Sequence, residues 1–180
     1  MTSAPRWLSD QEQRAWRALQ QFGAPLAAAL NRQLLADSAL SSADYQVLVV
    51  LTETDGGVLR AGELGRETGW EKSRLSHHLK RMEARGLVRR EECLTDGRGL
   101  LVVITKAGRQ AIADAAPGHV AAVRDLVIDV LDPEQLRVLA EAGEAVAARL
   151  TAVNCRAEAE LGVDESSACA NAMDDVSTSS

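Results

Sequence analysis

Residues 59–105 place two short amphipathic patterns directly before two runs with β character, and this order constrains the fold more than any other feature. The stretch LRAGELGRET is typical of a short helix, with Gly69 in the left-handed position that ends it. A second helix is expected from about Glu71 to Arg85, with Gly86 closing it. Two short helices joined by a tight glycine turn predict a helix-turn-helix.

The runs LVRREEC and LLVVIT follow this pair of helices. The first alternates weakly and the second is a continuous β-branched run, so we expect a small hairpin that packs on one face. Its connection, residues 94–99, contains Asp-Gly and a second glycine, as a turn with positive φ requires. A helix-turn-helix followed by a two-stranded ribbon is a winged helix.

Helices are also expected before this unit. Ser9 and Glu12 form the reciprocal capping pattern that starts a helix, and apolar residues then recur every three or four positions. Pro25 is expected to kink this helix. A second capping pattern at Ser41 and Asp44 starts another helix, which should end near residue 54.

Two further helical stripes follow the β runs. Valines recur between residues 120 and 130, after a kink or break at Pro117, and an apolar seam runs from residue 136 to 153. Asp132 should cap the helix that carries this seam. The stripes hold more apolar surface than one small winged domain can cover, so we expect them to bury against a second copy of the chain. The alternative is that a monomer packs both stripes internally.

Composition agrees with a mainly α protein, because aromatic residues make up only 3% of the 180 residues and the core must be built from Ala, Leu and Val. The predicted fold is a winged helix-turn-helix with N- and C-terminal helices forming a dimerisation arm. Residues 1–36 form the N-terminal helix of this arm, residues 37–108 the DNA-binding domain and residues 109–161 the C-terminal dimerisation helices. Residues 162–180 are expected to be a disordered acidic tail.

The distribution of charge favours nucleic acid as a partner. The net charge of -6 argues against it as an average, but residues 58–110 hold 12 Lys or Arg and 7 Asp or Glu, against 8 and 19 in the remainder. A local positive field on an acidic body is expected of a protein that touches phosphate with one face.

One face of the 71–85 helix is the predicted reading surface. At roughly 100° per residue, Leu75, Leu79 and Met82 share the buried side. The remaining surface is rich in hydrogen-bonding and cationic groups, and a major groove admits such a helix. The predicted DNA-contacting residues are Ser73, Arg74, Ser76, His77, His78, Lys80 and Arg81. The alternative is a solvated basic face.

The wing tip supplies the other predicted contact. Arg98 is expected to enter an adjacent minor groove, where narrow A·T tracts concentrate negative potential. Asp96 is expected to orient Arg98 or cap the turn, and Gly97 and Gly99 to support the wing. The alternative is that Arg98 pairs with Asp96 on the surface.

The order of elements and the stretches AGELGRETG, KSRLSHHLKRMEARGLV and TDGRGLLVVITKAG resemble the MarR family of bacterial transcription regulators over about residues 9–155. The most specific piece is Asp96-x-Arg98 followed by Thr105-x-x-Gly108. The resemblance implies a two-fold dimer with one recognition helix and one wing per half-site. It also implies repression of nearby genes, often relieved by a small ligand.

The expected partners are therefore double-stranded DNA, a second copy of the chain and a small-molecule effector. The predicted lining of an effector cleft is Trp16, Phe22 and Tyr45. The alternative is that these aromatic residues only pack in the core. We expect no enzyme, metal or cofactor, because His77 and His78 diverge on a helix and no nucleophile, base and orienter converge. The absence of a signal peptide or apolar span indicates a cytoplasmic protein without membrane contact. The other functional class is a winged-helix module for protein or RNA contacts without sequence-specific DNA binding.

Overall fold

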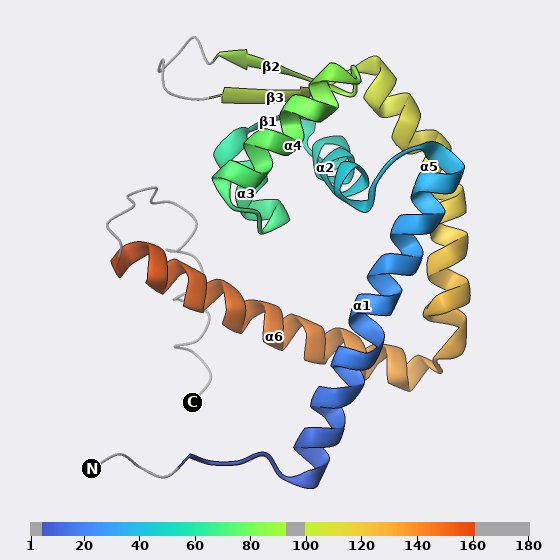
Figure 1. The fold of residues 1–180 in the computed structure, drawn as a ribbon, viewed down its shortest axis with the longest axis vertical. Coiled ribbons are helices and arrows are strands. Elements are labelled where there is room, and N and C mark those ends of the chain that lie inside the picture. Colours follow the sequence, from blue (N-terminus) through green and yellow to red (C-terminus); the bar gives the residue numbers. More distant parts are fainter. Residues whose placement is uncertain (1–4, 93–99, 161–180) are drawn as a thin grey trace. The chain divides into compact units, whose positions relative to one another are not determined.

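The computed structural model describes residues 5–92 and 100–160. It divides into two compact units, Met1–Val127 and Ile128–Ser180. Helices dominate both, and the first unit adds a small sheet (Figure 1), which confirms the mainly α class. The predicted wing tip with Asp96, Gly97, Arg98 and Gly99 lies outside the described residues, as does the predicted tail 162–180.

The two N-terminal helices are α1 (Asp10–Ser38) and α2 (Ser42–Glu53), and both begin as predicted. The Glu12 amide donates to the Ser9 hydroxyl, and the Glu12 carboxylate accepts from the Ser9 N–H at 2.7 Å. The same capping box starts α2. Pro25 lies inside α1, which continues past it.

The helix-turn-helix consists of α3 (Ala61–Thr68) and α4 (Lys72–Ala84). Gly69 has φ +67°, and its N–H donates to a carbonyl of the last turn of α3, as a glycine cap does. Gly86, at φ +71°, follows the end of α4. Both glycines thus stand at the helix ends that the sequence predicted.

The sheet has three strands rather than the two of the predicted hairpin. After the short 3-10 turn η1 (Asp55–Gly57), β1 (Val58–Arg60) pairs antiparallel with β3 (Leu100–Ile104), which also pairs with β2 (Val88–Glu92). We expected residue 59 to be helical, and this is wrong. A three-residue strand is too short to show a period of two, so its partner 43 positions later decides its conformation.

The core of the first unit lies where α1 to α4, the sheet and α5 (Lys106–Leu126) meet. Thr105 caps α5 by accepting from the Gly108 N–H at 2.9 Å, and its hydroxyl also contacts the Gly86 carbonyl at 2.6 Å. Pro117 lies within α5 without ending it. The largest fully buried side chains are Leu34, Leu40, Val47, Leu48, Leu51, Leu64, Leu79, Met82, Val88 and Val102.

The second unit contains η2 (Ile128–Val130) and the long helix α6 (Pro133–Glu160). Asp132 caps α6 as predicted, because the Gln135 N–H donates to its carboxylate at 2.8 Å and its own N–H donates to the Gln135 side chain. Within this single chain the α6 seam is exposed at Leu139, Val146, Leu150 and Val153.

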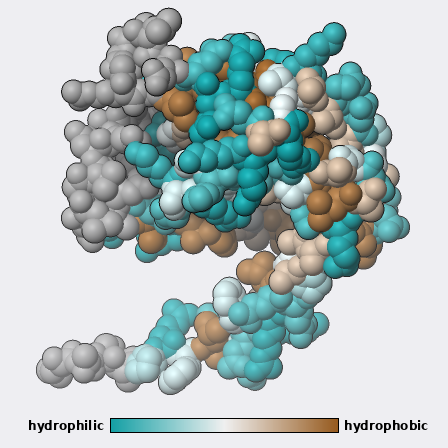
Figure 2. All heavy atoms as spheres, turned by 45° about the horizontal axis from the view of Figure 1, so that its top comes forward, coloured by the Kyte–Doolittle hydropathy of each residue, from teal (hydrophilic) through white to brown (hydrophobic). Residues whose placement is uncertain are grey.

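Figure 2 shows hydrophilic side chains over much of the visible face, with apolar patches among them. The α1 helix also leaves Trp16, Leu19 and Phe22 about half exposed. In residues 5–92 and 100–160, no single helix is both long and apolar enough to cross a membrane. Only α1 and α2 taken together, bent by 79°, pass that test of length and composition.

Gly108 provides a test of the packing between the wing and α5. A Cβ at this position would overlap the backbone carbonyl oxygen of Leu87. We expect Gly108→Ala to lower the free energy of unfolding by about 1–3 kcal/mol, as overpacking against rigid backbone does. Gly23→Ala is the control, because nothing lies within 4 Å of its added methyl group. Urea unfolding at one protein concentration measures both, and equal stabilities for the two variants would contradict this packing.

Candidate nucleic-acid interface

The outer side of α4 carries six of its seven predicted contact residues. Leu75, Leu79 and Met82 are buried against the core, as the helical wheel predicted. The exposed residues are Ser73, Arg74, Ser76, His77, Lys80 and Arg81. No carboxylate interrupts this stretch, so the surface offers hydrogen-bond donors and positive charge together. Contact of these side chains with DNA stays a prediction.

His78 corrects the prediction for this face. Its exposed fraction is 6%, so it does not reach an incoming ligand from the surface of α4. On a wheel with roughly 100° per residue, His78 lies only about 60° from Leu75, within the arc that faces the core. Its polarity led us to group it with its exposed neighbour His77, although its angular position already indicated burial.

A buried carboxylate ties α4 to the beginning of α2. Asp44 accepts from the Ser41 N–H at 2.9 Å and from the Ser41 hydroxyl at 2.8 Å. Arg85, just after α4, donates to the same carboxylate at 2.7 Å and to the Ala39 carbonyl at 2.7 Å. Burial raises the pKa of Asp44, but these hydrogen bonds and the Arg85 charge outweigh burial and leave the pKa lowered.

His78 lies between this carboxylate and two exposed arginines. Its Nε2 is 3.0 Å from Asp44 Oδ1 but has no well-aligned hydrogen-bond partner, so this contact is mainly electrostatic. Its Nδ1 is 2.9 Å from Arg81 Nη2. The ring also meets Trp70 edge to face, with centroids 5.2 Å apart, and Arg74 lies 4.5 Å from the centroid of that indole. Burial lowers the pKa of His78, the charges of Arg81 and Arg74 lower it further, and Asp44 opposes them.

The first wing strand is also attached to α4. Glu83 accepts from the Arg90 N–H at 3.0 Å and from the Arg90 guanidinium at 2.8 Å. The hydrogen bond from the Arg90 side chain lowers the pKa of Glu83 despite partial desolvation. Strand β2 and the helix therefore form one connected unit.

The predicted effector residues do not come together. Tyr45 lines a hollow of about 470 Å³ between α1, α2 and α5, where its ring centroid is 4.4 Å from that of His119. Burial lowers the pKa of His119 and raises that of Tyr45. Trp16 and Phe22 are about half exposed and are not among the residues that line this hollow, so the single chain does not bring the three residues together there. Both residues precede Ala27, the first residue of α1 that lines the hollow, and the sequence spacing did not reveal this. A shared effector cleft stays a prediction.

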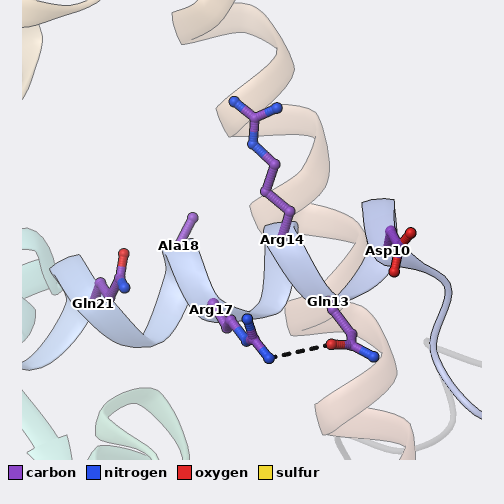
Figure 3. A pocket seen from close by; sticks show the side chains of 6 residues that line it. All are labelled: Asp10, Gln13, Arg14, Arg17, Ala18 and Gln21. Atoms are coloured by element: carbon purple, nitrogen blue, oxygen red, sulfur yellow. Dashed lines mark hydrogen bonds between the residues drawn. The ribbon is translucent and has the colours of Figure 1, made fainter.

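A second hollow of about 460 Å³ is a shallow feature of α1 alone (Figure 3). Arg17 donates to Gln13 across it at 3.3 Å, and none of the predicted site residues lines it. Within the described part of the chain, no group of three or more His, Cys, Asp or Glu side chains is placed to hold a metal ion. The candidate site is therefore the α4 surface, which carries the exposed cationic and hydrogen-bonding side chains.

Known proteins share this architecture. Residues 40–99 match the family model described as "MarR family". AbsC, a MarR family transcriptional regulator from Streptomyces coelicolor, is 42% identical with a TM-score of 0.77, and the match covers 82% of this chain and 99% of AbsC. Sco3205, a MarR family regulator from the same organism solved in complex with DNA, is 40% identical with a TM-score of 0.79 and coverage of 83% and 93%.

A curated relative agrees with these structures. The HTH-type transcriptional regulator TtmR of Methylorubrum extorquens (strain PA1) is 34% identical over 100 residues, which are 54% of this chain. The match spans about half the length of that relative. The sequence and structural comparisons therefore agree that this chain is similar to transcriptional regulators.

The lowered pKa values of the buried His78 and the half-buried His119 predict a loss of stability in mild acid. Because the pKa values of His78 and His119 are lowered, the native protein binds fewer protons than the unfolded chain, whose histidines titrate near about 6.5. The free energy of unfolding should therefore fall as the pH decreases below about 6.5. His78→Asn should remove part of that decline.

Urea unfolding between about pH 5 and 7.5 measures this effect above the range in which Asp44 titrates. His77→Asn is the matched control, since His77 is an exposed neighbour on the same helix. Identical pH slopes for wild type and His78→Asn would show that His78 is not the group responsible.

Proposed function

The chain belongs to the MarR family of transcriptional regulators, and from this we propose that it is a homodimer that binds a palindromic operator, represses nearby genes and is released by a small ligand. The exposed cationic face of α4 carries the proposal. The complex of its relative Sco3205 with DNA supports it. We assign residues 37–108 to the DNA-binding domain and residues 1–36 and 109–161 to the dimerisation region.

The chemistry of α4 suits reading of base edges. Arg81 and Arg74 can each donate two hydrogen bonds to guanine in the major groove, while Lys80 suits phosphate. Ser73, Ser76 and His77 add shorter groups that donate or accept. The buried Leu75 side fixes the rotation of the helix, so these side chains face outward together. Arg98 on the wing is assigned to the neighbouring minor groove.

The exposed seam of α6 supports self-association. Leu139 is 44% exposed and Val146 and Leu150 are each 57% exposed in the single chain, on a helix of 28 residues. A stripe of this kind is an interface in a soluble protein far more often than a free surface. A two-fold dimer would present two α4 helices to half-sites about 34 Å apart.

The hollow beside Tyr45 is the assigned effector site. Asn31, Gln46 and His119 provide polar groups in an otherwise apolar lining. Such a mixture suits a small organic molecule, which apolar contacts hold and a few polar groups orient. A ligand that binds one arrangement of the dimer more tightly would shift the population between operator-binding and released states.

Selection of genomic DNA fragments by the purified protein tests the function directly. We expect bound fragments to share an inverted repeat, with binding that weakens steeply as salt rises because several phosphates are neutralised per dimer. Fragments without a shared repeat would contradict the dimeric reading mode. Absence of this salt-dependent DNA binding would favour the alternative, a winged-helix module for protein or RNA contacts.

Single variants assign the contacts on that operator. Arg81→Ala and His77→Ala should change the preference among operator variants by about 1–3 kcal/mol if they reach base edges. Arg98→Ala should weaken binding severalfold. Arg14→Ala removes an equal charge from α1 and is the charge control, with sedimentation to confirm that it remains a dimer; its operator binding should be unchanged. Gel shifts give all four results, and an unchanged shift for Arg98→Ala would contradict the wing assignment.

Leu150→Glu tests the α6 interface, because a charge buried in the seam should oppose pairing. Sedimentation should show a dimer for wild type and a monomer for the variant, with loss of operator binding. Ala148→Glu is the matched control, since residue 148 lies about 200° around the helix from residue 150. A wild-type monomer in sedimentation would contradict the proposal.

A further inference from the structure

Two exposed arginines of α4 are connected to one buried ring. Arg81 Nη2 lies 2.9 Å from His78 Nδ1. A guanidinium has only donors, so Nδ1 must be the acceptor, and the neutral ring carries its proton on Nε2. That proton is on the side of Asp44 Oδ1, 3.0 Å away. The Arg81 guanidinium thus fixes the tautomer, and the nearby Asp44 carboxylate favours it electrostatically without a well-aligned hydrogen bond.

Arg74 is linked to the His78 ring indirectly, because it contacts Trp70, which in turn contacts His78. It lies 4.5 Å from the centroid of Trp70, whose ring meets His78 at 89°. Positions 74 and 81 are seven residues apart, so both arginines lie on one side of α4, about 10 Å apart along its axis. His78 lies between them in the sequence, and its side chain is buried whereas both arginines are exposed.

Attachment of α4 to the core does not require this imidazole. Leu75, Leu79 and Met82 already bury one side of the helix, and Arg85 already joins its end to Asp44. Nε2 meanwhile lacks a well-aligned partner, although it is buried. A buried polar group with incomplete hydrogen bonding lowers stability, so its presence calls for a role other than packing.

We propose that His78 is a positioning residue for operator reading, whose Nδ1 holds the Arg81 guanidinium in the direction needed to meet a base edge. This inference rests on the proposed DNA-binding function. A free arginine side chain samples many rotamers, and one hydrogen bond from behind restricts that sampling before DNA arrives. Sequence preference at the base pair that Arg81 reads therefore depends on a residue that never touches DNA.

Four variants test this role: His78→Leu, His78→Asn, Arg81→Ala, and His78→Leu combined with Arg81→Ala. His78→Leu removes the acceptor at similar size, whereas His78→Asn keeps an amide oxygen near the position of Nδ1. The test compares affinity for the selected operator with affinity for the same operator changed at the base pair where Arg81→Ala relaxes the preference. If Arg81 contributes about 1.4 kcal/mol of discrimination, its loss is a tenfold change in the affinity ratio.

His78→Leu should lose most of that ratio, and His78→Asn should retain most of it. His78→Leu combined with Arg81→Ala should be no less selective than Arg81→Ala alone, because both changes remove one interaction. An additive loss in the double variant, or full preference in His78→Leu, would overturn the role of His78. So would an Arg81→Ala variant that keeps the full preference.

Ring nitrogen NMR of the full-length protein keeps the inference testable if His78→Leu does not fold. In wild type, Nδ1 should be unprotonated and Nε2 protonated, and the Nδ1 signal should shift in Arg81→Ala. An Nδ1 signal that is the same in both proteins would overturn the inference. Absence of any sequence preference in wild type would instead contradict the proposed function, while the nitrogen signals would still show whether Arg81 is held.

Discussion

Burial of the Asp44 carboxylate is the constraint on which the geometry of the first unit depends. A buried charge must be compensated, and here the compensation comes from the turn before α2 and from the residue just after α4. Ser41 also uses Asp44 to start α2, so one carboxylate both caps a helix and holds a second helix. The direction of α4 relative to α2 is therefore set by hydrogen bonds as well as by apolar packing.

The remaining contacts extend from that carboxylate toward the surface. His78 lies next to Asp44, and Arg81 lies next to His78. Glu83 joins the same helix to β2 through Arg90. The outer face of α4 is thus supported from both its core side and its wing side, which reduces the freedom of a binding surface before a ligand arrives.

Local patterns predicted the parts of the fold that depend on near neighbours in the sequence. The capping boxes at Ser9 and Ser41, the glycine at position 69 and the buried stripe of Leu75 are all encoded within a few residues. The third strand and the burial of His78 are not, because their partners are 43 and 34 positions away. Asp44 had a sufficient local explanation as a cap, which concealed its second role. The burial of His78 could have been predicted from its angle on the helical wheel.

The charges of the central segment explain how an acidic protein presents a cationic face. Several of its arginines are neutralised internally, since Arg85 pairs with Asp44, Arg90 with Glu83 and Arg89 with Glu91. In the described part of the chain, Lys80 and Arg81 form no such pair with a carboxylate. These pairs cancel charge around Asp44 and along β2, whereas the exposed Lys80 and Arg81 of α4 keep theirs. The positive field is therefore local, and the net charge of -6 says little about what this surface attracts.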